Sequence, residues 1–226
     1  MKFIGKLQGA AGFRESVEEY SPEKGVDSRE LIELVKSTYD FQIFPTLTPG
    51  APMPPVLTFG GGRLLASDGS IAISNLFMSQ EGDVAICADT DLADLVLNSL
   101  IALLDDNLDY RLRESQKAKS YLSNIVVQFD KGLEGYINKL SSIAGIINSK
   151  RGKESEFNIK RIGFGPVDMP HTPDPLSTIE AAEFLIERRA GRPFSENRYF
   201  CSAPFSIGDH LAILERIEAT ISTGSN

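Results

Sequence analysis

The sequence predicts an α+β fold in which an antiparallel or mixed sheet of about 6–8 strands is covered by about 4–5 helices in a two-layer arrangement. Two observations lead to this prediction. Short β segments follow one another between residues 56 and 89, and helical patterns lie around them without the regular alternation of a parallel sheet. Neither an internal repeat nor a break in composition is recognisable, so we expect a single domain over residues 1–226.

The first predicted helix covers residues 28–38. Asp27 is its expected N-cap, and Glu30 completes a capping box. Its apolar stripe consists of Leu31, Leu34 and Val35. A strand is expected at residues 40–47, before a loop whose prolines fit neither a helix nor a central strand. The P-x-x-P spacing in this loop would also suit an aromatic groove, although prolines more often simply stiffen a loop.

An antiparallel meander is predicted for residues 56–89. Glycine and aspartate at Gly60–Gly62, Asp68–Gly69 and Glu81–Asp83 can supply the positive φ that hairpin turns need. A helix follows, with Thr90 as its expected N-cap. Its predicted buried face consists of Leu92, Leu95, Val96, Leu100, Ile101 and Leu104.

Two segments fit more than one element. Residues 121–129 alternate and are rich in β-branched side chains, which favours a strand, but a continuous helix over residues 110–148 is an alternative. Residues 177–189 begin with a capping box and favour a helix, whereas residues 182–190 also fit a strand. An amphipathic helix is expected from residue 131 to 149.

The C-terminal part of the chain contributes two further strands and a helix. The strands are expected at residues 157–165 and 198–205, with a proline-rich loop after the first of them. The final helix is expected to begin between Ser206 and Asp209.

Composition excludes several classes of protein. Apolar residues at 42% and charged residues at 24% are typical of a globular chain rather than a disordered one. No apolar stretch approaches the roughly 20 residues needed to cross a bilayer, and the first residues lack the apolar core of a signal peptide. Cys87 and Cys201 are expected to be buried, reduced thiols. We therefore expect a soluble cytoplasmic protein.

The distribution of charge is uneven along the chain. The net charge of −8 argues against bulk nucleic-acid binding, which requires clustered lysine and arginine. Residues 1–110 carry 7 basic and 17 acidic side chains, whereas residues 111–200 carry 15 and 11. This asymmetry permits contact between copies of the chain or a basic face for an anionic partner, although an ordinary solvated surface explains it equally simply.

An aspartate cluster gives the sharpest enzymatic hypothesis. Asp83, Asp89 and Asp91, with Asp94 nearby, could hold Mg²⁺ or Mn²⁺ for phosphoester hydrolysis if they converge within about 5 Å of a common point. The simpler interpretation is a turn at Asp83 and a helix N-terminus at the others, where anionic side chains are favoured. We expect no resident metal or other cofactor.

The remaining catalytic motifs are weak. His171 and His210 are the only imidazoles, which excludes a histidine-rich metal site. His210 could pair with Cys201 or Ser202, but the flanking residues lack a known nucleophile signature. The glycines of FGGG and GFGP fit turns better than phosphate cradles, because FGGG precedes another strand and Pro166 lacks an N–H donor.

A group of arginines is the candidate surface for an anion or a protein partner. Arginine binds carboxylate or phosphate through two parallel hydrogen bonds, and neighbouring aromatic residues could stack a base. Solvated charge beside core aromatics is the simpler explanation. The candidates are Arg161, Arg188, Arg189, Arg192 and Arg198.

Because every catalytic constellation also has a structural explanation, we expect a non-enzymatic interaction or assembly module that self-associates or belongs to a larger complex. Such a module should expose an apolar or charge-complementary patch. Two alternatives come from other classes. One is a metal-dependent phosphoesterase or nuclease that uses the aspartate cluster. The other is a binder of a small anionic or nucleotide ligand at Arg188 and Arg198.

Overall fold

The computed structural model describes residues 1–14, 22, 27–48, 53–67, 69–80, 82–112, 119–130, 132, 146–147, 149, 160–166 and 175–223. Its strands are β1 (Lys2–Arg14), β2 (Val56–Ala66), β3 (Gly69–Ser79), β4 (Gly82–Cys87), β5 (Lys119–Gln128), β6 (Arg161–Phe164), β7 (Phe184–Arg188) and β8 (Arg198–Ala203). Its α-helices are α2 (Ser28–Thr38), α3 (Thr90–Leu108), α5 (Pro175–Glu180) and α6 (Ile207–Thr223). No described helix is both long and apolar enough to span a bilayer.

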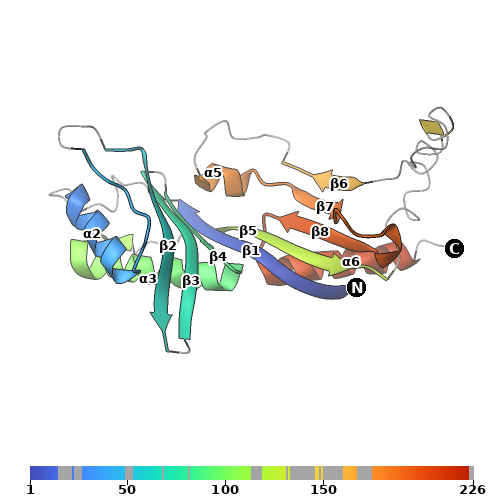
Figure 1. The fold of residues 1–226 in the computed structure, drawn as a ribbon, viewed down its shortest axis with the longest axis horizontal. Helices are drawn as coiled ribbons and strands as arrows, with labels where there is room; N and C mark the ends of the chain where they lie inside the picture. The colour runs from blue at the N-terminus through green and yellow to red at the C-terminus, as the bar shows by residue number, and fades with distance from the viewer. Residues whose placement is uncertain are drawn as a thin grey trace.

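The eight strands form one antiparallel sheet in the order β2-β3-β4-β1-β5-β8-β7-β6 (Figure 1). Helices pack against this sheet, so the predicted α+β class is confirmed. The long helices α3 and α6 lie on one side of the sheet and the short helix α5 lies on the other (Figure 1). The second face is therefore partly covered as well.

The two halves of the sheet share one topology. β1 pairs with β4 as β5 pairs with β8, and α3 follows β4 as α6 follows β8. Gly9 pairs with Cys87 at the end of β4, and Ser123 pairs with Ala203 at the end of β8. β1 and β5 then join the halves by antiparallel pairing. The sequence shows no recognisable repeat, and this correspondence appears only in the strand pairing.

β1 lies at the centre of the sheet, although the sequence suggested no element for residues 1–14. Glycine and alanine have low β propensity, which conceals the strand. The glycines are explained by close packing. A Cβ at Gly9 would lie 2.1 Å from the main-chain carbon of Asp89, and a Cβ at Gly12 would lie 2.7 Å from Leu176 Cδ1. These glycines allow the starts of α3 and α5 to approach the central strand.

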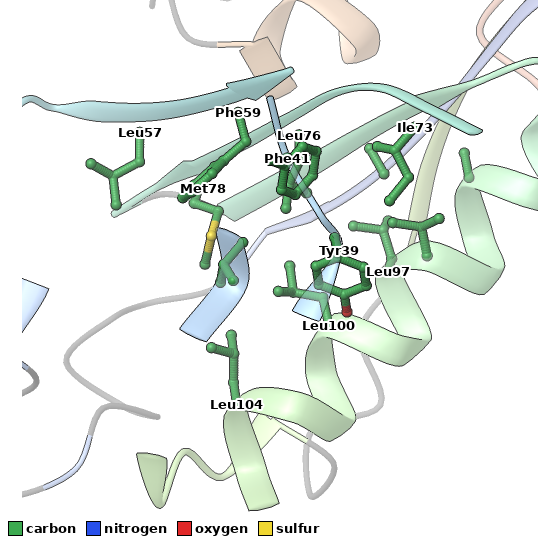
Figure 2. Packing of buried hydrophobic residues seen from close by; sticks show 14 of the residues in the cluster. Tyr39, Phe41, Leu57, Phe59, Ile73, Leu76, Met78, Leu97, Leu100 and Leu104 are labelled. Carbon is green, nitrogen blue, oxygen red and sulfur yellow. The ribbon is translucent and has the colours of Figure 1, made fainter. Parts of the chain in front are cut away.

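The larger core lies between α2, α3 and the β2-β3-β4 side of the sheet. Figure 2 shows the side chains of these elements packing together. The predicted helix at residues 28–38 is confirmed, with Asp27 as its N-cap. Tyr39 is fully buried, and its hydroxyl donates a hydrogen bond to Ser99 Oγ at 3.1 Å. The sticks labelled in Figure 2 are Tyr39, Phe41, Leu57, Phe59, Ile73, Leu76, Met78, Leu97, Leu100 and Leu104.

Two smaller clusters cover the rest of the sheet. α6 packs through Ile207 and Leu214 on the β5-β8-β7 side. On the opposite face, α5 packs through Leu176 and Ile179 against Ala10 and Val84. α5 therefore covers the centre of the second face, close to the junction of the two halves.

The glycine motif at Gly60–Gly62 does not form the predicted turn. β2 continues through it from Val56 to Ala66. Gly61 has a φ of +65°, and a Cβ at Gly62 would lie 2.4 Å from the Phe41 ring. Without side chains at these glycines, the segment after α2 has room to cross β2. The strand expected at residues 40–47 is reduced there to a single bridge between Ile43 and Gly60.

Other boundaries differ from the sequence predictions. Asp89, not Thr90, caps α3, since its Oδ1 accepts a hydrogen bond from the Leu92 N–H at 2.9 Å. Leu95 is 51% exposed instead of buried. The strand interpretation holds at β5, so a continuous helix over residues 110–148 is wrong.

The structure also decides the second ambiguous segment. α5 ends at Glu180, and β7 follows it. The predicted helix over residues 177–189 is therefore wrong, and the strand interpretation of residues 182–190 holds. Phe184, Ile186 and Arg188 are buried and alternate with partly exposed residues, as a strand requires. Most of the helix expected at residues 131–149, together with His171, lies outside the described residues.

Candidate functional site

The candidate site lies where β8 ends beside β5. β8 pairs with Ser123–Gln128 of β5, and its last pair joins Ala203 to Ser123. Lys119–Leu122 continue beyond this point, paired with β1 on one side and with no described strand on the other. Main-chain groups of successive residues alternate between the two sides of an antiparallel strand. Some N–H and C=O groups of this stretch therefore point to the open side.

A pocket of about 310 Å³ lies along this open edge. Its volume is near the lower end of the range of about 300–1,000 Å³ that is usual for ligand sites. Because the pocket lies along an open strand edge and is small, it suits a short segment of extended chain better than a large cofactor. Its walls include Lys119, Tyr121, Glu180, Phe205, Ser206 and Asp209.

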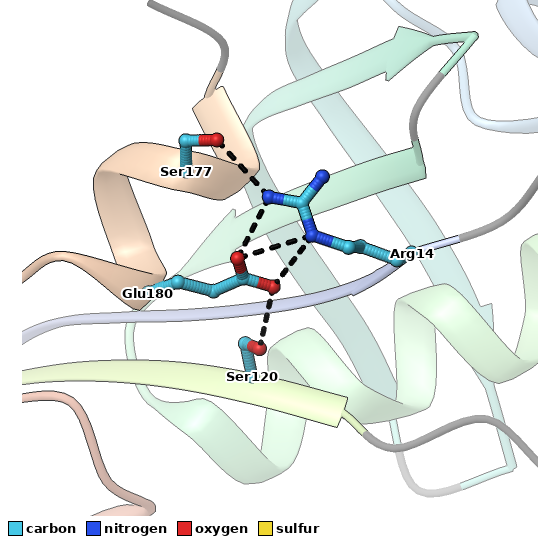
Figure 3. A network of polar contacts seen from close by, with 4 residues as sticks. All are labelled: Arg14, Ser120, Ser177 and Glu180. Carbon is cyan, nitrogen blue, oxygen red and sulfur yellow. Dashed lines mark hydrogen bonds and ion pairs between the residues drawn. The ribbon is translucent and has the colours of Figure 1, made fainter. Parts of the chain in front are cut away.

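Glu180 of α5 fixes one wall of the pocket (Figure 3). Arg14 Nε lies 3.1 Å from each Glu180 carboxylate oxygen, and Arg14 Nη2 donates to Glu180 Oε2 at 2.7 Å. Arg14 Nη2 also donates to Ser177 Oγ at 3.0 Å, and Ser120 Oγ donates to Glu180 Oε1 at 3.3 Å. These bonds hold the end of β1 and the start of β5 against α5.

A second polar group lies on the α3 side of the same edge. Lys119 Nζ donates to Asp94 Oδ1 at 2.6 Å, and the Tyr121 hydroxyl donates to the same oxygen at 3.4 Å. Burial raises the pKa of Tyr121, and neighbouring carboxylates raise it further: Asp94, Asp91 and Asp209. The electrostatic potential at Tyr121 is therefore negative, although the Lys119 ammonium lies nearby.

The start of α6 forms the remaining wall. Ser206 Oγ accepts a hydrogen bond from the Asp209 N–H at 3.2 Å and donates to Asp209 Oδ2 at 2.8 Å. The Ile207 N–H donates to Thr90 Oγ1 at 3.0 Å, which attaches α6 to the first turn of α3. No cation pairs with Asp209 within the part of the chain that the structure describes.

β1 has an open edge of its own. β4 pairs only with Gly9–Arg14, so Lys2–Gln8 have β5 on one side and no described strand on the other. The register with β5 shifts twice in this stretch, which leaves Ile4 and Leu7 as the extra residues of two bulges. Phe3, Ile4 and Leu7 are 41%, 37% and 51% exposed. Apolar side chains are therefore exposed along this open edge.

The three candidate aspartates are not brought together. Asp83 lies near the start of β4, Asp89 follows its end, and Asp91 belongs to the first turn of α3. Asp89 Oδ2 accepts a hydrogen bond from Lys6 Nζ at 2.6 Å. Burial raises the pKa of Asp89, but hydrogen bonds from Lys6 and the Leu92 N–H outweigh it, so the pKa is lowered overall. Among the described residues, no group of three potential ligand side chains is placed to hold a metal ion.

His210 bonds Ser123 rather than Cys201. Its Nδ1 lies 2.8 Å from Ser123 Oγ, and its ring packs edge-on against Phe184. Both His210 and Cys201 are fully buried. Burial lowers the pKa of His210 to about 4 and raises that of the Cys201 thiol to about 12. A neutral imidazole and a protonated thiol in the core are a packing arrangement, not an activated nucleophile.

Arg188 and Arg198 point to opposite faces of the sheet. Arg188 pairs across the strands with Tyr199, whose side chain lies on the face opposite to that of its neighbour Arg198. The Arg188 guanidinium lies over the Tyr199 ring, 4.9 Å from its centroid. Arg198 Nε lies 3.2 Å from Glu196 Oε2. These two arginines do not line one concave site.

The other three candidate arginines have separate positions. Arg161 of β6 forms an ion pair with Glu183. Arg189 is partly buried after β7, and Arg192 is exposed in the turn that follows. Sequence reasoning missed the residues of the pocket, because only the spacing of Ser206 and Asp209 carries a local signal, that of a helix start.

No family model matches the chain, and comparison with curated proteins and with solved structures finds no match either.

Proposed function

We propose that the chain is a non-enzymatic assembly module, and that two copies pair through the open edge of β1 at Lys2–Gln8. One observation carries the proposal: Phe3, Ile4 and Leu7 are exposed on a strand whose second side has no described partner. An open strand edge offers N–H and C=O groups to another strand. Apolar side chains beside such an edge favour an interaction that covers them.

The sequence of this edge is self-complementary. Antiparallel pairing about Gly5 places Phe3 of each copy opposite Leu7 of the other. The same register keeps Lys2 and Lys6 from facing each other or themselves, and like charges directly opposite one another would be destabilising. The shared edge is only about 23 Å long at roughly 3.3 Å per residue, so we expect a weak, concentration-dependent dimer.

The surroundings of the other candidate sites support a role without catalysis. The aspartates lie apart, and His210 and Cys201 have packing roles. Both cysteines are free, buried thiols, which supports a reducing cytoplasmic environment.

Sedimentation velocity over a wide concentration range tests the proposal. We expect the mass to rise above that of one chain, and we expect Leu7→Lys to return it to one chain, since a charge on a strand edge opposes pairing. Leu65→Lys is the matched control, because Leu65 is 76% exposed at the far end of β2.

Both variants change exposed side chains, and their thermal unfolding should match that of the parent chain. A mass of one chain at every concentration would overturn pairing through β1. An equal loss of association in Leu7→Lys and Leu65→Lys would do the same, because it would show that added charge acts without regard to position.

A further inference from the structure

We propose that the pocket beside β5 is a second docking site, which takes an extended segment of a partner protein carrying a lysine or arginine side chain. The site differs from the β1 edge in position and in chemistry. It consists of the open stretch Lys119–Leu122, the wall made by α5 and the first turn of α6.

The main chain of β5 provides the first half of the recognition. Lys119–Leu122 extend about 13 Å beyond the end of β8, at roughly 3.3 Å per residue. This length allows a partner segment of three or four residues to pair where β8 has ended. Strand addition of this kind draws its affinity from main-chain hydrogen bonds and its specificity from pockets beside the edge.

The internal repeat supports this assignment. Lys119–Leu122 precede Ser123 in β5 as Gly5–Gln8 precede Gly9 in β1, so the shared topology leaves the same stretch open in both halves. The two edges differ in what surrounds them. Exposed apolar side chains lie along β1, whereas a pocket with ionised walls lies along β5. The two edges therefore select different partners.

Charge decides which side chain the pocket accepts. Arg14 neutralises Glu180, and Asp94 neutralises Lys119. Asp209 remains without a cation among the described residues, and it contributes to the negative surroundings of Tyr121. A guanidinium or ammonium group provides the donors that such a carboxylate accepts. The net charge of −8 also favours the approach of a basic segment.

An anionic ligand fits the same place poorly. The first turn of α6 would attract an anion, but the Asp209 side chain already lies in that turn, hydrogen-bonded to Ser206. A second negative group there would face Asp209 at close range. The pocket therefore selects a cation over a phosphate or carboxylate.

A fluorescence titration tests the proposal. The chain has no tryptophan, so Phe205→Trp places a single reporter at the pocket. The probe is the peptide acetyl-Val-Arg-Val-Arg-Val-Arg-amide, added at protein concentrations that give the mass of one chain. We expect saturable binding, weaker binding of the peptide with glutamine in place of arginine, and loss of binding when its main-chain nitrogens are methylated.

Two variants in the reporter background separate the pocket from general charge attraction. Asp209→Asn keeps a residue suited to the helix start and should weaken binding about two- to fivefold, as expected for one partly exposed ion pair. Glu33→Gln is the matched control, because it removes one negative charge at an exposed position of α2 and should leave binding unchanged.

Three outcomes would overturn the proposal: equal affinity for the arginine and glutamine peptides, undiminished binding of the methylated peptide, or equal effects of Asp209→Asn and Glu33→Gln. Each of them leaves self-association through β1 intact, since that association is measured without peptide. Conversely, a chain that never dimerises can still bind the arginine peptide.

Discussion

Gly9 of β1 lies directly against Thr90 at the start of α3: a Cβ on Gly9 would be 2.1 Å from the main-chain nitrogen of Thr90. Thr90 is itself fully buried, and its hydroxyl oxygen accepts the hydrogen bond from Ile207 that attaches α6 to α3. The central strand and the two long helices therefore meet at one point. Changes at this point should disturb both halves of the molecule.

Replacement of Gly9 by alanine should destabilise the fold strongly. The added methyl group meets main chain, which cannot move aside as a flexible side chain can. We expect the free energy of unfolding to fall by about 3 kcal/mol or more, at the upper end for overpacked sites. Gly5→Ala is the control in the same strand, since nothing lies within 4 Å of its Cβ, and it should change stability by less than about 0.5 kcal/mol. Urea unfolding measures both, and equal effects would contradict this packing.

Thr90→Val should weaken the attachment of α6 to α3. The variant keeps the shape of the side chain but removes the acceptor for the Ile207 N–H, which is then buried without its partner. We expect a loss of about 1–3 kcal/mol. Thr90→Ser retains the hydroxyl and should recover most of the hydrogen-bond contribution. Amide hydrogen exchange at Ile207 provides the local measurement, and unchanged protection in Thr90→Val would count against the bond.

The unfolding free energy should fall between pH 6.5 and pH 4 because of His210. Burial lowers the pKa of His210 to about 4 in the folded state, below its usual 6.5. As the pH falls, the unfolded chain therefore takes up the proton first, which favours unfolding. The stability that the neutral ring contributes is complete only above pH 6.5. We expect a slope of at most about 1.4 kcal/mol per pH unit in this window.

The control for this pH dependence is His210→Gln, which cannot gain a charge. Urea unfolding at several pH values should give a flatter profile for the variant between pH 6.5 and pH 4. Identical slopes for the two proteins would show that His210 is not held neutral in the folded state.

The two cysteines should be unreactive in the folded protein. Burial raises the pKa of both Cys87 and Cys201 to about 12, with Asp89 contributing at Cys87, so almost no thiolate forms at neutral pH. A thiol reagent such as dithionitrobenzoate should label neither residue until denaturant unfolds the chain. Rapid labelling of one thiol under native conditions would show that its strand opens locally.

Elements with strong local signals were predictable. The helix at residues 28–38 begins with a cap at Asp27 and has a regular apolar stripe, and the structure has the same boundaries. β5 was recognisable as a strand because it is rich in β-branched and aromatic residues, and β8 was recognisable in a segment that contains two aromatic residues. In each case the deciding interactions lie within a few residues of one another, where sequence spacing reports them directly.

Elements defined by distant contacts were not predictable. β1 has weak β propensity and exists because β4 and β5 pair with it from both sides. Glu180 forms part of the pocket because Arg14, 166 residues away in the sequence, binds its carboxylate. Gly60–Gly62 has the composition of a turn, yet β2 continues through it because Phe41 packs over Gly62.

The sequence by itself determined the α+β class, the N-cap and bounds of α2 and the start of α6, because neighbouring residues fix these through periodicity and local hydrogen bonds. Only the tertiary structure decided the strand order, the repeat of one topology in both halves and the open stretches of β1 and β5. Strand order depends on which segments lose the least conformational entropy and bury the most apolar surface when they pair. Both quantities depend on contacts between distant parts of the chain, so local sequence spacing does not report them.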